Sequence, residues 1–510
     1  MASAALLAIS LYVLMGAGQP PTDRTRPAVT LPAGRVVGTS TGSVSRYLGI
    51  PFGAAPVRFD PPKPVDNWQG TYDASQYKPG CIQEFKYPAT ARNQIMKWFN
   101  SPPNPAGESE DCLYLDVFAP ANAEEGSKAV MVWLFGGDFA FGTGSLPLYD
   151  GTSFAETQDV VVVTPSYRTN VFGFPGSPEK PMSEQNLGLL DQRLALEWVQ
   201  RNIHRFGGDP DRVTLFGESA GGASVEILVT NPPTPVPFVG AIVHSGQGSV
   251  DFRTNNSAVS WKRLSKAAGC DSDRAAQLSP IYDGGVTYNG TGRRDRLSST
   301  PTDSRIARVP LLIGSNANES SMFIYGQTDI KAFLAKSLPQ LANRTDELLD
   351  AYPEYDSAGG PINLKLAAIV TEFRFQCPIK IVAEESAAVG IPTWRYYFDA
   401  GFPNTDIFPG SGAYHSSEIS LVFGTYPRNG STPYQVEVSR AMQKVWADFA
   451  KDPSRGPGWA AVPQISIFGG GVRPGGDDGT GKPVMEVGDP TNIDKRCLLY
   501  KDIYDDETLV

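Results

Sequence analysis

Short runs of consecutive apolar residues recur along this chain, and segments with a helical pattern separate them. Continuous apolar runs are typical of strands that a parallel sheet buries on both faces. Here they cover residues 130–135, 160–165, 213–216, 241–244, 309–313 and 394–398. Apolar residues at helical spacing predict helices over residues 187–203 and 438–449. The alternation predicts an α/β fold with a mostly parallel central sheet and helices on both faces. Residues 35–52 instead predict a small group of antiparallel strands at the beginning of the fold.

The composition excludes several classes of protein. Of the 510 residues, 41% are hydrophobic and 19% are charged, which is typical of a globular chain. The chain has 44 basic and 54 acidic residues and a net charge of −10, so we expect no nucleic-acid partner. After the first 20 residues no apolar stretch approaches the roughly 20 residues of a membrane span, so we expect no stable membrane insertion.

The first residues are typical of a secretory signal peptide. Residues 4–15 are apolar and uncharged and lead into Gly16-Ala17-Gly18, although no Lys or Arg precedes them. We therefore expect residues 1–18 to be removed and residues 19–510 to form one secreted domain. The chain has five Asn-x-Ser/Thr sequons, and in a secreted protein we expect glycosylation at four of them, Asn255, Asn289, Asn343 and Asn429. The fifth, Asn318, adjoins Glu319, which is a candidate site residue, so we expect it to be unmodified.

The segment Gly217-Glu218-Ser219-Ala220-Gly221 matches G-x-S-x-G between an apolar run and a helical stretch. In that setting the serine occupies a sharp strand-to-helix turn that exposes its hydroxyl above the sheet. Small residues on either side let the strand and the helix pass close to each other. The helix N-terminus adds N–H donors beside the serine. These features predict that Ser219 is a nucleophile.

A serine nucleophile needs a histidine base and a carboxylate that orients it. In this architecture the chain order is serine, acid, histidine. His204 precedes the serine and is excluded, and His244 lies in an apolar run, where we expect a buried, hydrogen-bonded side chain. The base is therefore His415, which lies in a turn-rich segment. Glu319 follows the run that ends at Ile313 and is the first choice for the acid.

A tetrahedral intermediate also needs N–H donors for its oxyanion. One is expected from Ala220, directly after the serine, and others from the glycine-rich turn that follows residues 130–135. No metal or organic cofactor is expected. The cysteines lack zinc spacing, and the match to GxxxxGK at residues 476–482 is followed by Pro483 in place of the Ser or Thr that holds magnesium.

Several motifs together resemble the type-B carboxylesterase family, the cholinesterase and fungal-lipase group of α/β-hydrolases. They are Glu110-Asp111-Cys112-Leu113-Tyr114-Leu115-Asp116-Val117, Ser166-Tyr167-Arg168, Phe206-Gly207-Gly208-Asp209-Pro210, the Gly217–Gly222 elbow, Asn316-Ala317-Asn318-Glu319 and Ala413-Tyr414-His415. The resemblance implies an α/β-hydrolase fold and the triad Ser219, Glu319 and His415. It also implies the disulfides Cys81–Cys112 and Cys377–Cys497, which leave Cys270 unpaired.

The resemblance places the oxyanion donors at Gly137 and Asp138, where the family has glycines at both positions. An Asp N–H still donates, but its carboxylate beside a developing oxyanion would oppose catalysis. This leaves three hypotheses for Asp138: its side chain turns away from the oxyanion and is tolerated, it activates the deacylating water, or it damages turnover. The chain is also shorter than the family near residues 270–288, which bears on acyl preference.

The expected function is hydrolysis of carboxylic esters through an acyl-enzyme on Ser219. A polar, proline-rich segment over residues 82–111 favours small esters over lipids. Two alternatives stay open at this point. One is a lipase acting on long acyl chains, and the other is a catalytically impaired binding protein of the same fold.

Overall fold

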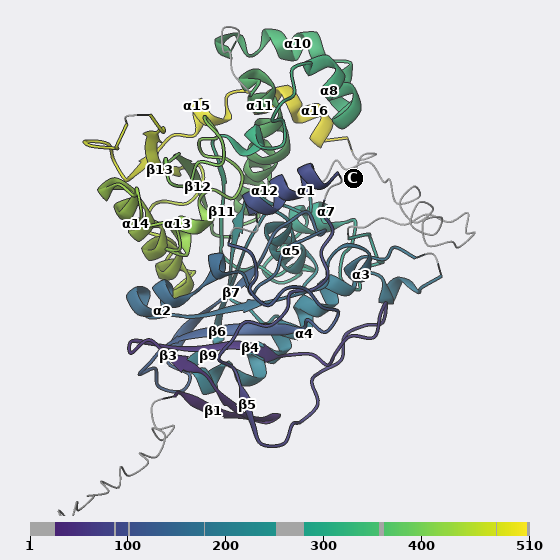
Figure 1. Ribbon diagram of the computed structural model, residues 1–510. Coiled ribbons are helices and arrows are strands. Elements are labelled where there is room, and N and C mark those ends of the chain that lie inside the picture. The colour runs from purple at the N-terminus through teal and green to yellow at the C-terminus, as the bar shows by residue number, and fades with distance from the viewer. Residues whose placement is uncertain are drawn as a thin grey trace, which may run out of the picture.

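The structure is a computed structural model of the 510-residue chain (Figure 1). It describes residues 26–85, 88–99, 102–177, 179–250, 280–355, 362–475 and 477–506. The expected signal peptide, the sequon at Asn255 and the unpaired Cys270 lie outside these residues.

An eleven-stranded sheet runs through the middle of the molecule in the order β14-β13-β12-β11-β10-β9-β7-β8-β6-β4-β3. Seven consecutive strands are parallel: β13 (Ile465–Val472), β12 (Thr393–Ala400), β11 (Leu311–Asn316), β10 (Gly240–His244), β9 (Gly208–Glu218), β7 (Lys128–Leu134) and β8 (Val161–Pro165). Antiparallel strands flank them: β14 (Met485–Gly488), β6 (Tyr114–Pro120), β4 (Val44–Pro51) and β3 (Thr39–Ser40). All six apolar runs lie in parallel strands, so the predicted α/β architecture is confirmed.

Three strands of the large sheet, β6, β13 and β14, were not predicted from the sequence pattern. β6 has a buried Asp116 in its middle, which accepts a hydrogen bond from the Gly49 N–H at 2.6 Å. β13 contains three consecutive glycines, Gly469 to Gly471, before its last residue Val472, so its apolar run is short. Asp and Gly are unusual in buried strands, but β6 and β13 still form because each pairs along its backbone with neighbouring strands.

The predicted antiparallel start is confirmed. β1 (Ala28–Leu31) and β2 (Gly34–Val37) pair in antiparallel fashion, and β5 (Thr71–Asp73) extends this small sheet on the far side of β2. β3 and β4 likewise pair in antiparallel fashion at the edge of the large sheet.

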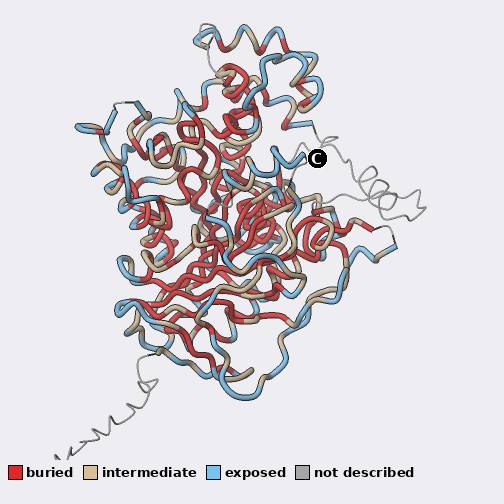
Figure 2. The backbone as a smooth tube through the Cα atoms, viewed as in Figure 1, coloured by how far each residue is buried: buried red, intermediate tan, exposed pale blue. Residues whose placement is uncertain are grey.

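Helices cover both faces of the large sheet, and alternate residues of each strand face different cores. Along β7, Val130, Val132 and Leu134 belong to one core, while Met131 and Trp133 belong to the other. The first core packs against α4 (Leu187–Asn202), α11 (Leu364–Thr371) and α12 (Cys377–Ala388). The second packs against α2 (Thr152–Gln158) and α14 (Pro433–Lys451), which lie beside α13 (Ile419–Val422) in Figure 1. Figure 2 shows the buried residues concentrated along these layers.

The remaining helices are mostly short. They are α1 (Ala89–Phe99), α3 (Asn170–Gly173), α5 (Ala220–Thr230), α7 (Gly292–Leu297), α8 (Ile330–Ser337), α9 (Pro339–Ala342), α10 (Thr345–Asp350), α15 (Thr491–Asp494) and α16 (Lys501–Tyr504). Single 3₁₀ turns are η1 (Pro147–Tyr149), η2 (Met182–Glu184), η3 (Ile203–Phe206), η4 (Glu319–Ser321), η5 (Pro353–Tyr355) and η7 (Cys497–Tyr500), and η6 (Glu372–Gln376) is a π-helical segment. Within the described residues, none of these helices has the length and apolar character needed to cross a bilayer.

Both disulfides that the resemblance implied are present. Cys81 and Cys112 are joined with Cα atoms 4.9 Å apart, and Cys377 and Cys497 with Cα atoms 5.3 Å apart. The first closes the segment that contains α1. The second ties the start of α12 to the C-terminal end of the described chain.

Candidate active site

Ser219 occupies a strained turn between β9 and α5. Its φ of 56° and ψ of −121° lie in a region that residues other than glycine rarely adopt. The Ser219 N–H donates to the His244 carbonyl oxygen at 2.9 Å, and the Ser219 carbonyl oxygen accepts from the Ala223 N–H at 2.8 Å. Bonds from the neighbouring strand and from the first turn of the helix therefore hold the strained conformation in place.

Glycines allow the backbone to close tightly around this turn. A Cβ on Gly221 would lie 1.9 Å from the Leu134 carbonyl oxygen, and a Cβ on Gly246 would lie 2.0 Å from the Ser219 carbonyl oxygen. A Cβ on Gly136 would lie 2.9 Å from the Ser219 Cβ. The loop that begins at Gly136 therefore lies directly against Ser219.

Glu319 and His415 meet at the C-terminal edge of the sheet. Glu319 Oε2 lies 2.6 Å from His415 Nδ1, and the two residues are 0% and 1% exposed. Glu319 Oε1 accepts hydrogen bonds from the Ser245 hydroxyl at 2.5 Å and from the Asn316 N–H at 2.6 Å. These contacts fix the carboxylate, which places the ring proton of a neutral His415 on Nδ1 and leaves Nε2 able to accept a proton.

The other nitrogen of this imidazole faces the serine turn. His415 Nε2 lies 3.1 Å from Glu218 Oε1, and within the described chain it makes no hydrogen bond. The Ser416 hydroxyl donates to the same Glu218 oxygen at 2.6 Å. Because Glu218 immediately precedes Ser219 in the chain, the free nitrogen is positioned beside the serine turn.

The two buried carboxylates change the acidity of the imidazole. Burial by itself lowers the pKa of His415, but the negative charges of Glu218 and Glu319 outweigh burial and raise that pKa above its ordinary value. Burial raises the pKa of Glu218, and the charge of His415 opposes that rise. An imidazole between two carboxylates is thus a stronger base than a free histidine.

The expected oxyanion donors lie in the loop after β7 and at the start of α5. Gly137 has a φ of 114° and Asp138 a φ of 57°, and both lie in the loop after β7, outside any strand or helix. Ala220 is the first residue of α5, where a backbone N–H has no acceptor within the helix. Asp138 is exposed, whereas Phe139 is buried and its carbonyl oxygen accepts from the Asn170 N–H at 2.6 Å.

Two phenylalanine rings flank His415. The Phe323 and Phe375 centroids lie 5.2 Å and 4.8 Å from the imidazole centroid, and the two phenyl rings stack at 6.0 Å. Phe375 belongs to the π-helical segment η6, and insertions of this kind are frequent at functional sites. Two aromatic rings therefore pack against the imidazole of His415.

A second aromatic group surrounds Trp98 of α1. Its ring lies 5.9 Å from Tyr325 and 5.3 Å from Phe408, both in edge-on geometry. No residue of α1 is fully buried, so the helix rests on this part of the surface largely through such contacts. Trp98 thus packs the disulfide-closed segment against the body of the protein.

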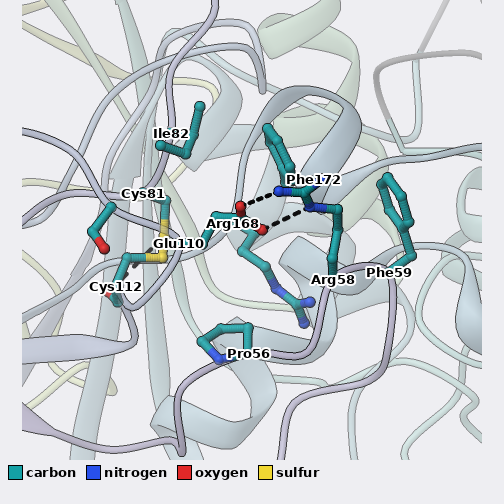
Figure 3. A pocket seen from close by; sticks show the side chains of 10 residues that line it. Pro56, Arg58, Phe59, Cys81, Ile82, Glu110, Cys112, Arg168 and Phe172 are labelled. Carbon is teal, nitrogen blue, oxygen red and sulfur yellow. Dashed lines mark hydrogen bonds and ion pairs between the residues drawn. A yellow bond between two sulfur atoms is a disulfide. The ribbon is translucent and has the colours of Figure 1, made fainter. Parts of the chain in front are cut away.

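A small pocket lies beside the first disulfide, and no triad residue lines it (Figure 3). Its walls include Phe59, Phe172 and Ile82, and the Arg58 side chain reaches across to Glu110 with a hydrogen bond of 2.9 Å. The lining also includes both cysteines of this disulfide and Arg168, so the pocket lies between the disulfide-closed segment and the body of the protein.

Three groups around the site were not assigned a role from the sequence. Ser245 and Asn316 hold Glu319, and Glu218 approaches the other side of His415. All three lie at or directly after the C-terminal ends of adjacent parallel strands, β10, β11 and β9. That position is the signal that would have found them, because sites in such sheets form along this edge. Among the described residues, no group of three or more His, Cys, Asp or Glu side chains is arranged to hold a metal ion.

Comparison with known proteins places the chain in a family. The family model described as "Carboxylesterase family" matches residues 25–284 and 273–464. The chain is 33% identical over 472 residues to the acetylcholinesterase of Bungarus fasciatus, covering 80% of this chain and 75% of that protein. It is 30% identical over 487 residues to the fumonisin B1 esterase of Sphingopyxis macrogoltabida, covering 87% and 86%.

A third relative is the para-nitrobenzyl esterase of Bacillus subtilis (strain 168), which is 32% identical over 473 residues, covering 84% of this chain and 90% of that protein. The family model spans most of the chain, the relatives are named as esterases, and the observed sheet is the one that an α/β-hydrolase requires. The protein is therefore a carboxylic ester hydrolase that belongs to the carboxylesterase family.

Proposed function

We propose that this protein is an exported serine esterase that hydrolyses small carboxylic esters through an acyl-enzyme on Ser219. The observation that carries the proposal is the orientation of His415. Its Nδ1 is held by Glu319 at 2.6 Å, while its Nε2 is free of hydrogen bonds within the described chain and lies beside the Ser219 turn. An imidazole that a carboxylate holds at Nδ1, with Nε2 left to accept a proton, supports the role of base for a serine hydroxyl.

In the proposed reaction, Ser219 Oγ attacks the ester carbonyl carbon while His415 Nε2 takes the hydroxyl proton. The N–H groups of Gly137, Asp138 and Ala220 stabilise the oxyanion of the tetrahedral intermediate. The ester C–O bond then breaks, and His415 returns the proton to the leaving alcohol. A water molecule attacks the acyl-enzyme by the same route in reverse, which releases the acid and regenerates Ser219. No cofactor enters this scheme.

The exposure of Asp138 supports the hypothesis that its side chain turns away from the oxyanion and is tolerated. Exposed charges interact weakly, at about 1 kcal/mol or less, because water screens them. A solvated carboxylate therefore opposes the oxyanion far less than a buried one would. Its backbone N–H keeps the role of donor whichever way the side chain points.

The aromatic rings beside His415 support a preference for short acyl groups. Replacing Phe375 with Ala removes one wall, and we expect the ratio of kcat/KM for butyrate over acetate p-nitrophenyl esters to rise about tenfold, since one methylene in a pocket contributes about 1–3 kcal/mol. The control is Phe172→Ala, which removes a ring from the separate pocket of Figure 3. An unchanged ratio in Phe375→Ala would place acyl selection elsewhere.

One observation favours a lipase as the second candidate. The helix α1 lies in the segment that Cys81 and Cys112 close, has no fully buried residue and contacts the body through Trp98. A loosely packed helix of this kind is suited to moving aside at a lipid surface. The comparison of monomeric and emulsified long-chain esters separates the candidates, because only a lipase gains activity above the solubility limit of its substrate.

Export of a mature chain over residues 19–510 is supported by the two disulfides, which persist in oxidising compartments. Asn343 and Asn429 are exposed, so glycans at these two sequons have access to solvent. Asn289 is half-buried and its amide donates to Asp295 Oδ2 at 3.3 Å. The Asn318 amide donates to the Ser411 carbonyl oxygen at 2.9 Å, which supports an unmodified Asn318 next to the site. Intact mass before and after enzymatic deglycosylation counts the occupied sequons.

The direct test is a millisecond-to-minute time course of p-nitrophenol release from a short-chain ester at near-stoichiometric enzyme. Ser219→Ala is the control. Sustained release that depends on Ser219 establishes the proposed mechanism. One equivalent followed by a stall means that acylation is intact and that the surroundings of Asp138 obstruct deacylation. No Ser219-dependent release across acyl lengths overturns the proposal in favour of a catalytically impaired binding protein.

A further inference from the structure

His244 is fully buried at the end of β10, and both of its ring nitrogens are engaged. Nε2 accepts a hydrogen bond from the Trp446 indole N–H at 2.8 Å, and Nδ1 lies 3.2 Å from Glu418 Oε1. β10 lies between β9, which leads into Ser219, and β11, which ends in Asn316. This imidazole is therefore buried at the end of a strand that lies between two strands of the proposed active site, and it has no contact with solvent.

The indole partner settles the protonation state of this histidine. A Trp N–H is a donor only, so the nitrogen that faces it must offer a lone pair. His244 is then neutral, its one ring proton is on Nδ1, and that proton is donated to Glu418. As long as the Trp446 hydrogen bond stands, His244 cannot become an imidazolium that neutralises Glu418.

Glu418 is therefore a buried anion that is stabilised by hydrogen bonds alone. It is 0% exposed, and its Oε2 accepts from the Asn316 amide at 2.6 Å. Within the described chain no Lys or Arg forms an ion pair with Glu418, and the basic side chain that contacts it is the neutral His244. Asn316 also donates from its amide to the Tyr414 carbonyl oxygen at 2.8 Å and from its backbone N–H to Glu319 at 2.6 Å. Asn316 thus contacts Glu418 through its side chain and Glu319 through its backbone, and it also holds Tyr414, the residue before His415.

We propose that His244 is a positioning residue that, locked as the neutral Nδ1–H tautomer by Trp446, keeps a full negative charge on Glu418 behind the Glu319–His415 pair. That charge makes His415 a stronger base, and Asn316 aligns the two carboxylates. The effect on catalysis rests on the proposed function for His415. The tautomer of His244 is independent of catalysis.

Other titratable groups near His415 and His244 also affect the charge around the imidazole of His415. Toward His415, burial lowers the pKa, and Glu218, Glu319 and Glu418 raise it. The Tyr396 ring of β12 lies 5.7 Å from the His244 ring, and burial holds the pKa values of Tyr396 and Tyr414 above that of a free tyrosine. The tyrosines stay neutral in the working pH range, so the charge near His415 depends on the three carboxylates.

The first test compares two substitutions of His244 by the pH dependence of kcat/KM. Gln can donate to Glu418 and accept from Trp446 at once, whereas Leu can do neither. In His244→Leu, the buried Glu418 loses a donor and takes up a proton, so the acid limb moves to lower pH by about one unit. His244→Gln keeps the wild-type midpoint. The matched control is His204→Leu, which removes an imidazole near Glu125 at the surface.

A second variant removes the lock and leaves the imidazole in place. In Trp446→Phe, Nε2 of His244 is free to bind a proton, and the resulting imidazolium neutralises Glu418. The acid limb again moves to lower pH. Trp394→Phe is the control, because it also removes one indole donor from the same core, where the acceptor is the Trp459 carbonyl oxygen at 3.0 Å. A lower kcat with an unmoved midpoint in both His244→Leu and Trp446→Phe would reduce His244 to a packing role and overturn the proposal.

The tautomer itself is measured by long-range ¹⁵N–¹H NMR on protein labelled at histidine, which contains three imidazoles. The Ser219→Ala protein serves here, so the result does not depend on turnover. We expect one imidazole to show the Nδ1–H pattern between pH 5 and 9 and to lose it in Trp446→Phe. The His244 signals are identified by their loss in His244→Gln. If that imidazole titrates, or carries its proton on Nε2, the inference is overturned even if the enzyme is an active esterase. Conversely, an inactive wild type with the expected tautomer removes only the proposed function.

Discussion

At the scale of single residues, one imidazole contacts two carboxylates on its two sides. Glu319 binds Nδ1 and Glu218 approaches Nε2 at 3.1 Å. Both side chains are buried, so their charges act through a medium that screens them weakly. The basicity of His415 is then a property of this cluster, and removing either charge changes it in a predictable direction.

Glu218→Gln is expected to move the acid limb of kcat/KM to lower pH. The base form of His415 is the neutral one, and the Glu218 charge raises the pKa at which that form appears. Without the charge, that pKa falls, by about one unit for a change of about 1.4 kcal/mol. Rate measurements from pH 5 to 10 test this, with Glu125→Gln at the surface as the control. A shift to higher pH would contradict the assignment of Glu218 as the charge beside Nε2.

Asp138→Gly is expected to change turnover by less than about fivefold, because an exposed charge contributes about 1 kcal/mol or less. The φ of 57° at this position is one that glycine adopts freely, so the loop keeps its shape. Burst and steady-state phases of p-nitrophenyl acetate hydrolysis separate acylation from deacylation. A deacylation rate that falls tenfold or more would show that the carboxylate activates water, and a large rise in acylation would show that it opposes the oxyanion.

At the scale of elements, the strand β9, the Ser219 turn and the helix α5 form one unit that depends on close backbone approach. The helix passes so near β7 that a side chain at Gly221 would meet the Leu134 carbonyl oxygen. Backbone atoms of a central strand cannot move aside without breaking the sheet. The Ser219 turn therefore keeps a strained backbone conformation because the adjacent strands and α5 hold it in place.

Gly221→Ala tests this unit. A Cβ 1.9 Å from a backbone oxygen forces α5 away from the sheet, so we expect loss of activity and a lower free energy of unfolding by about 1–3 kcal/mol or more. Gly488→Ala in β14 is the matched control, because no atom lies within 4 Å of its added Cβ. Activity and guanidinium unfolding are measured for both. Equal behaviour of the two variants would contradict the close approach.

At the scale of the whole molecule, the two disulfides close loops of different length. Cys81 and Cys112 are separated by 31 residues, and Cys377 and Cys497 by 120. The longer loop restricts the unfolded chain more strongly. It also joins the segment that carries Phe375, a ring that contacts His415, to the C-terminal helices.

Removing the long-loop disulfide is expected to destabilise the protein more than removing the short one. The chain-entropy relation predicts a loss of ~5 kcal/mol for Cys377→Ala with Cys497→Ala and ~4 kcal/mol for Cys81→Ala with Cys112→Ala. Urea unfolding of the two double variants under identical conditions measures the order. The reverse order would mean that packing of the disulfide-closed α1 segment contributes more than loop closure does.

The sequence by itself determined the class of fold and the residues most directly involved in the proposed reaction. Buried strands leave continuous apolar runs, and a G-x-S-x-G turn between a strand and a helix leaves a local pattern, so both could be read without coordinates. The order of serine, acid and histidine then selected Glu319 and His415. The disulfide pairing came from the resemblance to a family, since five cysteines alone allow many pairings.

Only the tertiary structure decided what surrounds those residues. Ser245 reaches Glu319 across 74 positions of sequence, Glu218 meets His415 across 197 positions, counted from residue 218 to residue 415, and His244 meets Glu418 across 174. No local pattern encodes such pairs, because they form where adjacent parallel strands bring their C-terminal ends to one edge. The physical reason is that local sequence sets the hydrogen bonding and the pattern of burial, whereas the charge near a buried imidazole is the sum of side chains that only the fold brings together.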